Sequence, residues 1–290
     1  VFDTYQQARA AMTKLGELLD TPTKTPNSPE AITPTRLAGE VRFENVRFRY
    51  DGAEADALAD VNFSVEPGEV IALVGETGAG KSTIVKLVAR FYDSTAGSIL
   101  IDGIPVEQLD LSAYRQQLGY VPQEPFLFSG TIHDNIAYAR PDATDLEVAR
   151  AAHAVGADSL VASLPGGYRH VVSERGRSLS AGQRQLIALA RAYLADPAIL
   201  LLDEATSSLD LATEAKVNRA MSLVAHGRTT ILIAHRLPTA RRADRILVVH
   251  GGRVVEEGRH EDLVNVHGRY AAMWDAFSED RFSGVRRAAG

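Results

Sequence analysis

One short stretch of the sequence combines residues that can hold a row of phosphate groups. The segment GETGAGKS, residues 75–82, contains three glycines, which let backbone N–H groups turn toward phosphate oxygens without a clash from Cβ. It follows an apolar run at 70–74 and precedes apolar residues at helical spacing, the setting that a phosphate-binding loop requires. Lys81 would reach the terminal phosphates, and the Ser82 hydroxyl would ligate Mg²⁺. The residues expected to contact a nucleotide here are Gly75, Glu76, Thr77, Gly78, Ala79, Gly80, Lys81, Ser82 and Thr83.

Two carboxylates end a second apolar run. In ILLLDE, residues 199–204, Asp203 and Glu204 follow a strand-like segment, and α/β folds place their ligands at the carboxyl edge of the sheet. Asp203 suits the metal, directly or through water, and Glu204 can polarise an attacking water as a general base. The alternative is a simple acidic strand end that leads into a helix N-terminus. A phosphate-binding loop in the same chain makes this alternative the weaker one.

A histidine ends a third apolar run, TTILIAH, residues 229–235. A lone histidine is more often structural or merely exposed than functional. Because this strand would end at the same sheet edge as the other two, we expect His235 to contact the γ-phosphate.

The stretch RSLSAGQRQLIALARAYL, residues 177–194, predicts a second anion site. Ser180 is a typical N-cap, and apolar residues recur behind it at helical spacing. The free N–H groups of the helix start would therefore face outward near Ala181 and Gly182, where they favour phosphate. One nucleotide needs only one such cradle, so a second one raises the question of what it binds.

The elements that must position these residues form an α/β pattern. Apolar and polar residues alternate in two pieces of the segment 40–50, and the pieces meet at a bulge or turn near Asn45. This pattern predicts antiparallel strands. The apolar runs described above predict central strands of a sheet that is covered on both faces. A hairpin is expected around Gly251 and Gly252, and residues 124–195 are mostly helical, which predicts a helical subdomain inserted into the core.

The composition along the chain predicts four segments. Residues 1–20 are expected to form an amphipathic helix with Phe2, Tyr5, Met12, Leu15 and Leu19 close to a single stripe. Residues 21–39 contain four prolines among Thr, Ser and Asn, a composition that predicts an unpacked linker. The folded domain is expected at 40–278 and a flexible tail at 279–290.

The composition excludes several classes of protein. The 290 residues carry a formal net charge of -6, so there is no basic face for nonspecific binding to nucleic acid. The absence of cysteine excludes disulfides and thiolate metal sites. No apolar run approaches the ~20 residues of a membrane span and no signal peptide opens the chain, so we expect this segment by itself to be soluble.

Taken in order, these motifs resemble those of the nucleotide-binding domain of ATP-binding cassette (ABC) transporters, from about Glu40 to Phe277. LSAGQRQ, residues 179–185, resembles the family signature, and GETGAGKS and ILLLDE resemble its two Walker motifs. The resemblance implies an α/β fold: a P-loop (RecA-like) ATPase core with an antiparallel β subdomain and an inserted α-helical subdomain. It also implies ATPase activity, with ATP and Mg²⁺ as cofactors.

The resemblance also implies roles for single residues. Gln123 corresponds to the Q-loop glutamine, which touches Mg²⁺ and the attacking water, so that Ser82, Gln123 and Asp203 would hold the metal. His235 corresponds to the switch histidine, so that Glu204, His235 and Gln123 would be the catalytic residues. Tyr50 corresponds to the aromatic that stacks on adenine, although it also suits a strand core. Further nucleotide contacts would come from the signature and from SSLD at 207–210, which resembles the D-loop: Ser180, Ala181, Gly182, Gln183 and Asp210.

Three details resemble ABC exporters in particular. Glu174, Arg175 and Gly176 stand just before the signature as in exporters, and residues 129–139 resemble the segment after the exporter Q-loop. The helix at 5–22 is similar to the cytoplasmic end of an exporter's last transmembrane helix. We therefore expect the C-terminal part of a fused permease-ATPase at the cytoplasmic face of the cell membrane, with its transmembrane domain in the same polypeptide. Ala181 departs from the family, which usually has glycine there.

The family explains why one chain carries two anion sites. Two domains meet head to tail, and each ATP lies between the phosphate loop of one and the signature helix of the other. The expected partner is thus a second nucleotide-binding domain, and the expected function is ATP hydrolysis that powers export. The alternative is a soluble ABC ATPase that acts on nucleic acid or the ribosome, which the net acidity and the N-terminal helix disfavour. A kinase or GTPase would have no use for LSAGQ.

Overall fold

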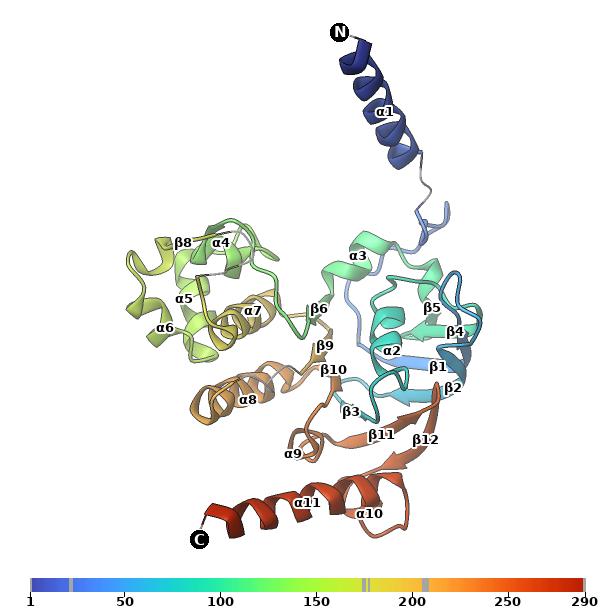
Figure 1. The fold of residues 1–290 in the computed structure, drawn as a ribbon, viewed down its shortest axis with the longest axis vertical. Helices are drawn as coiled ribbons and strands as arrows, with labels where there is room; N and C mark the ends of the chain where they lie inside the picture. Colours follow the sequence, from blue (N-terminus) through green and yellow to red (C-terminus); the bar gives the residue numbers. More distant parts are fainter. Residues whose placement is uncertain (1, 21–22, 174–175, 177, 205–208, 289–290) are drawn as a thin grey trace.

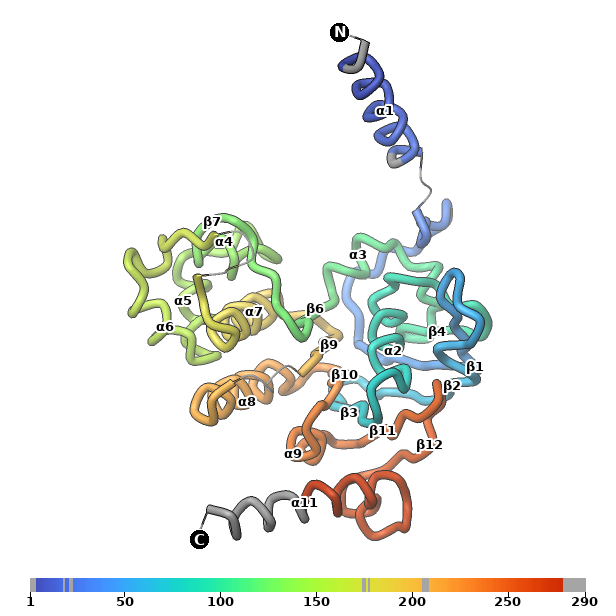
Figure 2. The backbone as a smooth tube through the Cα atoms, in the orientation of Figure 1, coloured from blue at the N-terminus to red at the C-terminus, as the bar shows by residue number. Residues whose placement is uncertain are grey.

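The computed structural model describes residues 2–20, 23–173, 176, 178–204 and 209–288. Two sheets and a group of helices form the body of the molecule, and one helix stands away from them at the N-terminal end (Figure 1). In its first half the chain alternates between a four-stranded and a six-stranded sheet. It then passes through the helical part and returns to the six-stranded sheet (Figure 2).

A six-stranded sheet lies at the centre, in the order β12-β11-β3-β10-β9-β6. Its pairs are parallel except for the edge hairpin of β11 and β12, which turns at Gly251 and Gly252 as the sequence predicts. The three apolar runs of the sequence are three of its inner strands. The strands are β3 (Val70–Val74), β6 (Leu118–Val121), β9 (Ile199–Asp203), β10 (Thr229–Ile233), β11 (Arg245–His250) and β12 (Arg253–Gly258).

An antiparallel sheet covers part of the central sheet, in the order β2-β1-β4-β5. The register of β1 shifts between Phe43 and Val46, and Asn45 adopts a positive φ of 50° there, which confirms the predicted irregularity. The rings of Phe43 and Phe63 stack across the sheet with centroids 4.5 Å apart. The strands are β1 (Val41–Phe48), β2 (Leu58–Val65), β4 (Ala96–Ile101) and β5 (Ile104–Pro105).

The helical part lies on the other side of the central sheet (Figure 1). It contains the helices expected between 124 and 195 and also a two-stranded pair, β7 with β8. Helix α7 is central to it, since it packs against α4, α5 and α8. The elements are β7 (Gly130–Thr131), α4 (Ile132–Ala137), α5 (Asp145–Ala154), α6 (Asp158–Ser163), a 3-10 turn (Gly167–Arg169), β8 (Val171–Val172), α7 (Ala181–Ala195) and α8 (Leu211–Ala225).

The remaining helices flank the two sheets. Helix α2 follows the phosphate-binding loop, and α9 follows β10. Helix α11 runs along the bottom of Figure 1 and extends into 279–288, within the segment for which a flexible tail stays a prediction. Their bounds are α1 (Phe2–Leu19), α2 (Lys81–Val88), a 3-10 turn (Val106–Gln108), α3 (Leu111–Gln116), α9 (Leu237–Ala240), α10 (His260–Leu263) and α11 (Arg269–Ala288).

Successive side chains of the central strands belong alternately to two separate hydrophobic cores. On β3, Ile71 and Leu73 join the core under the antiparallel sheet and α2, whereas Ala72 and Val74 join the core of the helical part. The same alternation holds on β9, where Leu201 and Leu202 belong to different cores. Burial on both faces is the reason why these strands are continuously apolar.

Most residues of the segment 23–39 are exposed, but several of its backbone groups bond to the domain, and its role as a linker stays a prediction. Arg90 is only 1% exposed and donates from Nη2 to the Pro26 carbonyl at 2.9 Å, while its Nη1 donates to the Leu109 carbonyl at 3.1 Å. Leu37 is buried and its N–H donates to Gln117 Oε1. Backbone hydrogen bonds together with the buried side chain of Leu37 thus attach this segment to the domain, and the composition of the segment does not reveal these contacts.

Helix α1 confirms the predicted helix at the N-terminal end and leaves its apolar stripe uncovered. Tyr5, Met12, Leu15 and Leu19 are all exposed. The helix projects away from both sheets (Figure 1). Within the described ranges, no helix has the length together with the apolar character that crossing a membrane requires.

Candidate functional site

The carboxyl ends of four neighbouring strands converge at one edge of the central sheet. Asp203, at the end of β9, pairs in register with Ile233 of β10, and Ile233 is level with Leu73 of β3. On the other side of β9, Val121 of β6 is level with Leu202. The segments that leave these strands contain the predicted phosphate loop, the two carboxylates, the histidine and the Q-loop glutamine. The sheet therefore brings these candidates to a common edge.

The phosphate loop connects β3 to α2, and its geometry depends on glycine. Gly75 has a φ of 143°, and a Cβ there would lie 2.1 Å from the Val249 carbonyl oxygen. Gly80 has a φ of 113°, and a Cβ there would lie 2.7 Å from Leu58. Any side chain at either position would displace the loop from the sheet. Glu76, Thr77, Gly78 and Ser82 are exposed along it.

Lys81 lies within the curve of this loop. Its Nζ donates to the carbonyl oxygens of Gly75 at 2.6 Å and Glu76 at 2.8 Å, and the residue is only 7% exposed. Burial lowers the pKa of its ammonium group, and the Asp203 carboxylate partly opposes that shift. A desolvated cation on a loop of backbone N–H groups is suited to bind phosphate, because its attraction to anions is screened less than in water.

Asp203 and His235 face each other across neighbouring strand ends. His235 Nε2 lies 3.3 Å from Asp203 Oδ1. Burial raises the pKa of Asp203, while His235, Lys81 and Lys86 act against the shift. The three basic groups favour the ionised carboxylate, which is the form that can ligate a cation bound together with phosphate.

Glu204 is 0% exposed, and its carboxylate is held on both oxygens. Oε2 accepts from the backbone N–H groups of His235 at 3.0 Å and Arg236 at 3.3 Å. Oε1 accepts from the Thr239 hydroxyl at 2.6 Å. Thr239 is not singled out by any sequence motif, and its local signal is its place four residues after His235.

Tyr50 lies at the end of the antiparallel sheet beside the start of α2. Its hydroxyl is 3.1 Å from Thr83 Oγ1, and its ring packs edge-on against Phe48 with centroids 4.7 Å apart. Lys86 Nζ lies 5.7 Å from the ring centroid. Tyr50 lies two residues after the end of β1, and its half-buried ring both packs against the core and borders the start of α2.

The predicted second anion site is the start of α7, which lies in a separate part of the molecule from α2 (Figure 1). Ser180 is the N-cap, as predicted, and forms a capping box with Gln183: Ser180 Oγ accepts from Gln183 N, and Gln183 Oε1 accepts from Ser180 N. Ser180 is exposed and Ala181 is half-buried. The structure therefore does not bring this helix start to the phosphate loop of the same chain.

The position that requires glycine in the signature is 182 rather than 181. A Cβ at Gly182 would lie 2.2 Å from Cγ2 of Thr213 on α8, whereas Ala181 carries its methyl group at a half-buried site. The departure at Ala181 is therefore sterically compatible with the packing of α7 on α8. We expect Gly182→Ala to lower the free energy of unfolding by about 1–3 kcal/mol, because the overpacked contact must open.

Chemical denaturation of the two variants Gly182→Ala and Ala181→Gly checks this expectation. Ala181→Gly is the matched control, and its cost should stay below about 1 kcal/mol because only helix propensity changes. Equal effects at the two positions would contradict the assignment of the tight contact to 182.

Two further candidates are Asp210 and Gln123. Asp210 is the N-cap of α8, where its Oδ1 accepts from the N–H groups of Ala212 and Thr213; hydrogen bonds from Thr213 lower its pKa. Gln123 is exposed two residues after the end of β6. The sequence matches at 174–175 and 207–208 lie outside the described residues.

The oxygen donors at the sheet edge fit Mg²⁺. A hydroxyl at Ser82, a carboxylate at Asp203 and an amide at Gln123 are hard ligands, and Mg²⁺ usually completes its shell with waters and substrate phosphates. Among the described residues, no group of three or more His, Cys, Asp or Glu side chains forms an all-protein metal site. The site thus suits a metal that is bound together with a phosphate substrate.

Comparison with known proteins shows a consistent set of relatives. Residues 58–207 match the family model described as ABC transporter. The chain is 50% identical over 276 residues to a multidrug efflux ATP-binding/permease protein of Mycobacterium bovis, covering 95% of this chain and 23% of that protein. It is 48% identical over 273 residues to an uncharacterised ABC transporter ATP-binding protein of Bacillus subtilis, covering 94% of this chain and 45% of that protein.

A solved structure gives the same result. A bacterial Atm1-family ABC exporter with ATP bound matches with a TM-score of 0.86 and 42% identity, covering 95% of this chain and 48% of that one. The chain thus spans less than half the length of these relatives.

Proposed function

Because the chain belongs to the ABC transporter family and contains its ATP-binding domain, an ATPase of α/β fold, we propose that it hydrolyses MgATP in a head-to-tail dimer and thereby powers export. The observation that carries the proposal is the separate position of the two anion sites. An exposed, capped helix start that lies apart from the phosphate loop of its own chain is suited to the nucleotide of a second copy.

Within each composite site, Lys81 and the loop N–H groups bind the phosphates, and Tyr50 packs against the adenine. Ser82, Asp203 and Gln123 hold Mg²⁺, which neutralises charge on the phosphate oxygens when it is bound. Glu204 orients and deprotonates the attacking water, and His235 contacts the γ-phosphate. From the partner, Ser180 and the N–H groups near Gly182 complete the shell around the triphosphate, with Asp210 and Gln183 nearby.

ATP stabilises the closed dimer because its charge is satisfied only when both surfaces are present. Hydrolysis separates the γ-phosphate from ADP, which removes the shared ligand and loosens the dimer. Binding and hydrolysis thus become closure and opening.

Two observations support a link between this site and export: the names of the relatives and the exposed apolar stripe of helix α1. The relatives are named as ATP-binding/permease proteins and as an ABC exporter, which supports a transmembrane domain in the same polypeptide and a position at the cytoplasmic face of the membrane. The exposed apolar stripe of α1 suits a helix that continues from such a domain. The segment 23–39 would join that helix to the ATPase.

A complementation experiment tests the head-to-tail arrangement. Ser180→Asp keeps an N-cap residue but places a negative charge against the partner's phosphates, and Lys81→Ala removes the phosphate-binding cation. Each variant alone should lose ATPase activity, since both composite sites of its homodimer are damaged. Mixing the two should restore activity, because one site of the mixed dimer has an intact loop and an intact signature.

Circular dichroism of each single variant controls for folding. An inactive mixture of two folded variants, or full activity of Ser180→Asp alone, would contradict the arrangement in which the two domains share each nucleotide.

A further inference from the structure

One short segment, 235–239, supplies three hydrogen-bond donors to the Glu204 carboxylate. A carboxylate that is fully buried must be paired with donors, since an unpaired buried charge is strongly unfavourable. His235 and Arg236 give backbone N–H groups to Oε2, and Thr239 gives its hydroxyl to Oε1. The same segment therefore carries His235 and fixes the proposed general base.

The bond from Thr239 differs from the other two. At 2.6 Å it has the length of a charge-assisted O–H···O⁻ hydrogen bond, and it comes from a side chain, whereas the other two come from backbone N–H groups. Thr239 lies on α9, and its own N–H donates to the Arg236 carbonyl at 3.1 Å. Because the backbone of Thr239 is held in this turn, its hydroxyl stays in place. Rotation of the Glu204 carboxylate would therefore move Oε1 away from the hydroxyl and break the hydrogen bond.

We infer that Thr239 is a positioning residue for ATP hydrolysis, acting through Glu204; the inference rests on the proposed role of Glu204 as the general base. Two donors on Oε2 fix one end of the carboxylate, and Thr239 on Oε1 fixes the other, so that the plane of the group is defined. Catalysis by a general base is sensitive to such orientation, because the accepting lone pair must meet the water along its O–H bond.

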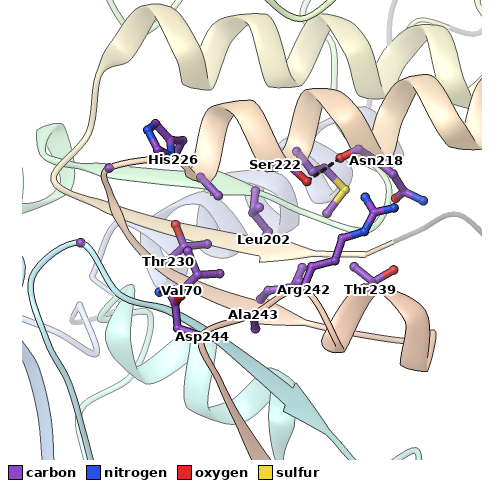
Figure 3. A pocket seen from close by; sticks show the side chains of 15 residues that line it. Val70, Leu202, Asn218, Ser222, His226, Thr230, Thr239, Arg242, Ala243 and Asp244 are labelled. Carbon is purple, nitrogen blue, oxygen red and sulfur yellow. Dashed lines mark hydrogen bonds between the residues drawn. The ribbon is translucent and has the colours of Figure 1, made fainter. Parts of the chain in front are cut away.

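Thr239 also borders a cavity of about 480 Å³ between α8, α9 and the central sheet, whose lining includes Leu202 and Arg242 (Figure 3). A substitution at Thr239 thus changes the packing of this cavity as well as the bond to Glu204. Thr230 separates the two effects. It lines the same cavity and is fully buried, but its hydroxyl donates to the Arg228 carbonyl at 3.1 Å.

The first experiment compares Thr239→Val, Thr239→Ser and the matched control Thr230→Val in steady-state ATP hydrolysis by the purified chain. Thr239→Val should lower kcat about tenfold or more while KM for ATP stays within about twofold, as expected when an interaction on the reacting groups is lost. Thr239→Ser should retain most of the activity because it keeps the hydroxyl. Thr230→Val should leave kcat near that of the parent chain.

Thr239→Ala provides a second way to remove the hydroxyl if the valine variant does not fold, and ATP affinity by calorimetry confirms an intact site. An unchanged or increased kcat in the folded variants that lack the hydroxyl would overturn the inference. So would a loss in Thr239→Ser equal to that in Thr239→Val, or an equal loss in Thr230→Val, since either would make packing the cause.

A double substitution tests whether Thr239 acts through Glu204. With Glu204→Ala as background, single-turnover hydrolysis should not slow further when Thr239→Val is added, because the group that Thr239 positions is gone. An additive loss would overturn the inference and leave the role of Glu204 intact. If Glu204→Ala itself left the rate unchanged, the proposed general base would be wrong and the inference would fall with it.

Discussion

Replacing Lys81 with alanine is expected to abolish measurable ATP binding by this chain. The ammonium group lies in the curve of the phosphate loop, where Nζ donates to Gly75 O and Glu76 O, and it is largely desolvated. Loss of about two charge-assisted hydrogen bonds to phosphate should cost about 3–6 kcal/mol, or about two to four orders of magnitude in Kd. Isothermal calorimetry with ATP measures the loss directly.

Lys216→Ala is the matched control for this prediction, because Lys216 is an exposed lysine on α8. It removes the same charge and should leave the affinity unchanged. Circular dichroism should show that the Lys81→Ala variant keeps its fold, since Lys81 bonds only to loop carbonyls that water or backbone groups can satisfy. ATP affinity that is undiminished in a folded Lys81→Ala variant would contradict the role assigned to this lysine.

Patterns within short segments predicted most of the fold and the places of the candidate residues. The apolar run at 70–74, the capping signal at Ser180 and the irregularity at Asn45 all depend on residues within one or two turns of each other, and the structure confirms each of them. Local patterns of this kind are readable because strand burial, helix capping and left-handed backbone follow from nearby residue types.

Contacts between distant segments could not be predicted in the same way. Arg90 binds the Pro26 carbonyl 64 positions away, and Thr239 binds Glu204 from 35 positions away. A threonine, or an arginine that follows a helix, is not distinctive in a sequence. The bonding partners of Arg90 and Thr239 are defined only after the fold has brought the distant segments together. The tight contact of Gly182 with Thr213 is of the same kind, since 31 positions separate the two residues.

Glu204→Gln should bind ATP normally, lower the turnover by about two to four orders of magnitude and accumulate as a dimer in MgATP. Glutamine cannot accept the proton of the attacking water, and general-base catalysis contributes about 10²–10⁴-fold to rates. The amide also fits the observed pocket. Its oxygen can accept from His235 N and Arg236 N, while its NH₂ group can donate to Thr239 Oγ1. The substitution thus removes the chemistry and keeps the packing.

Light scattering at saturating MgATP distinguishes trapping from simple inactivation. If the shared triphosphate holds the two copies together, Glu204→Gln should have twice the mass of the chain in MgATP and return to the monomer in ADP. Adding Lys81→Ala to Glu204→Gln should prevent the dimer, because the nucleotide that joins the surfaces no longer binds. A Glu204→Gln variant that binds ATP but stays monomeric would refute the sandwich, since closure would then require something other than the nucleotide between the two domains.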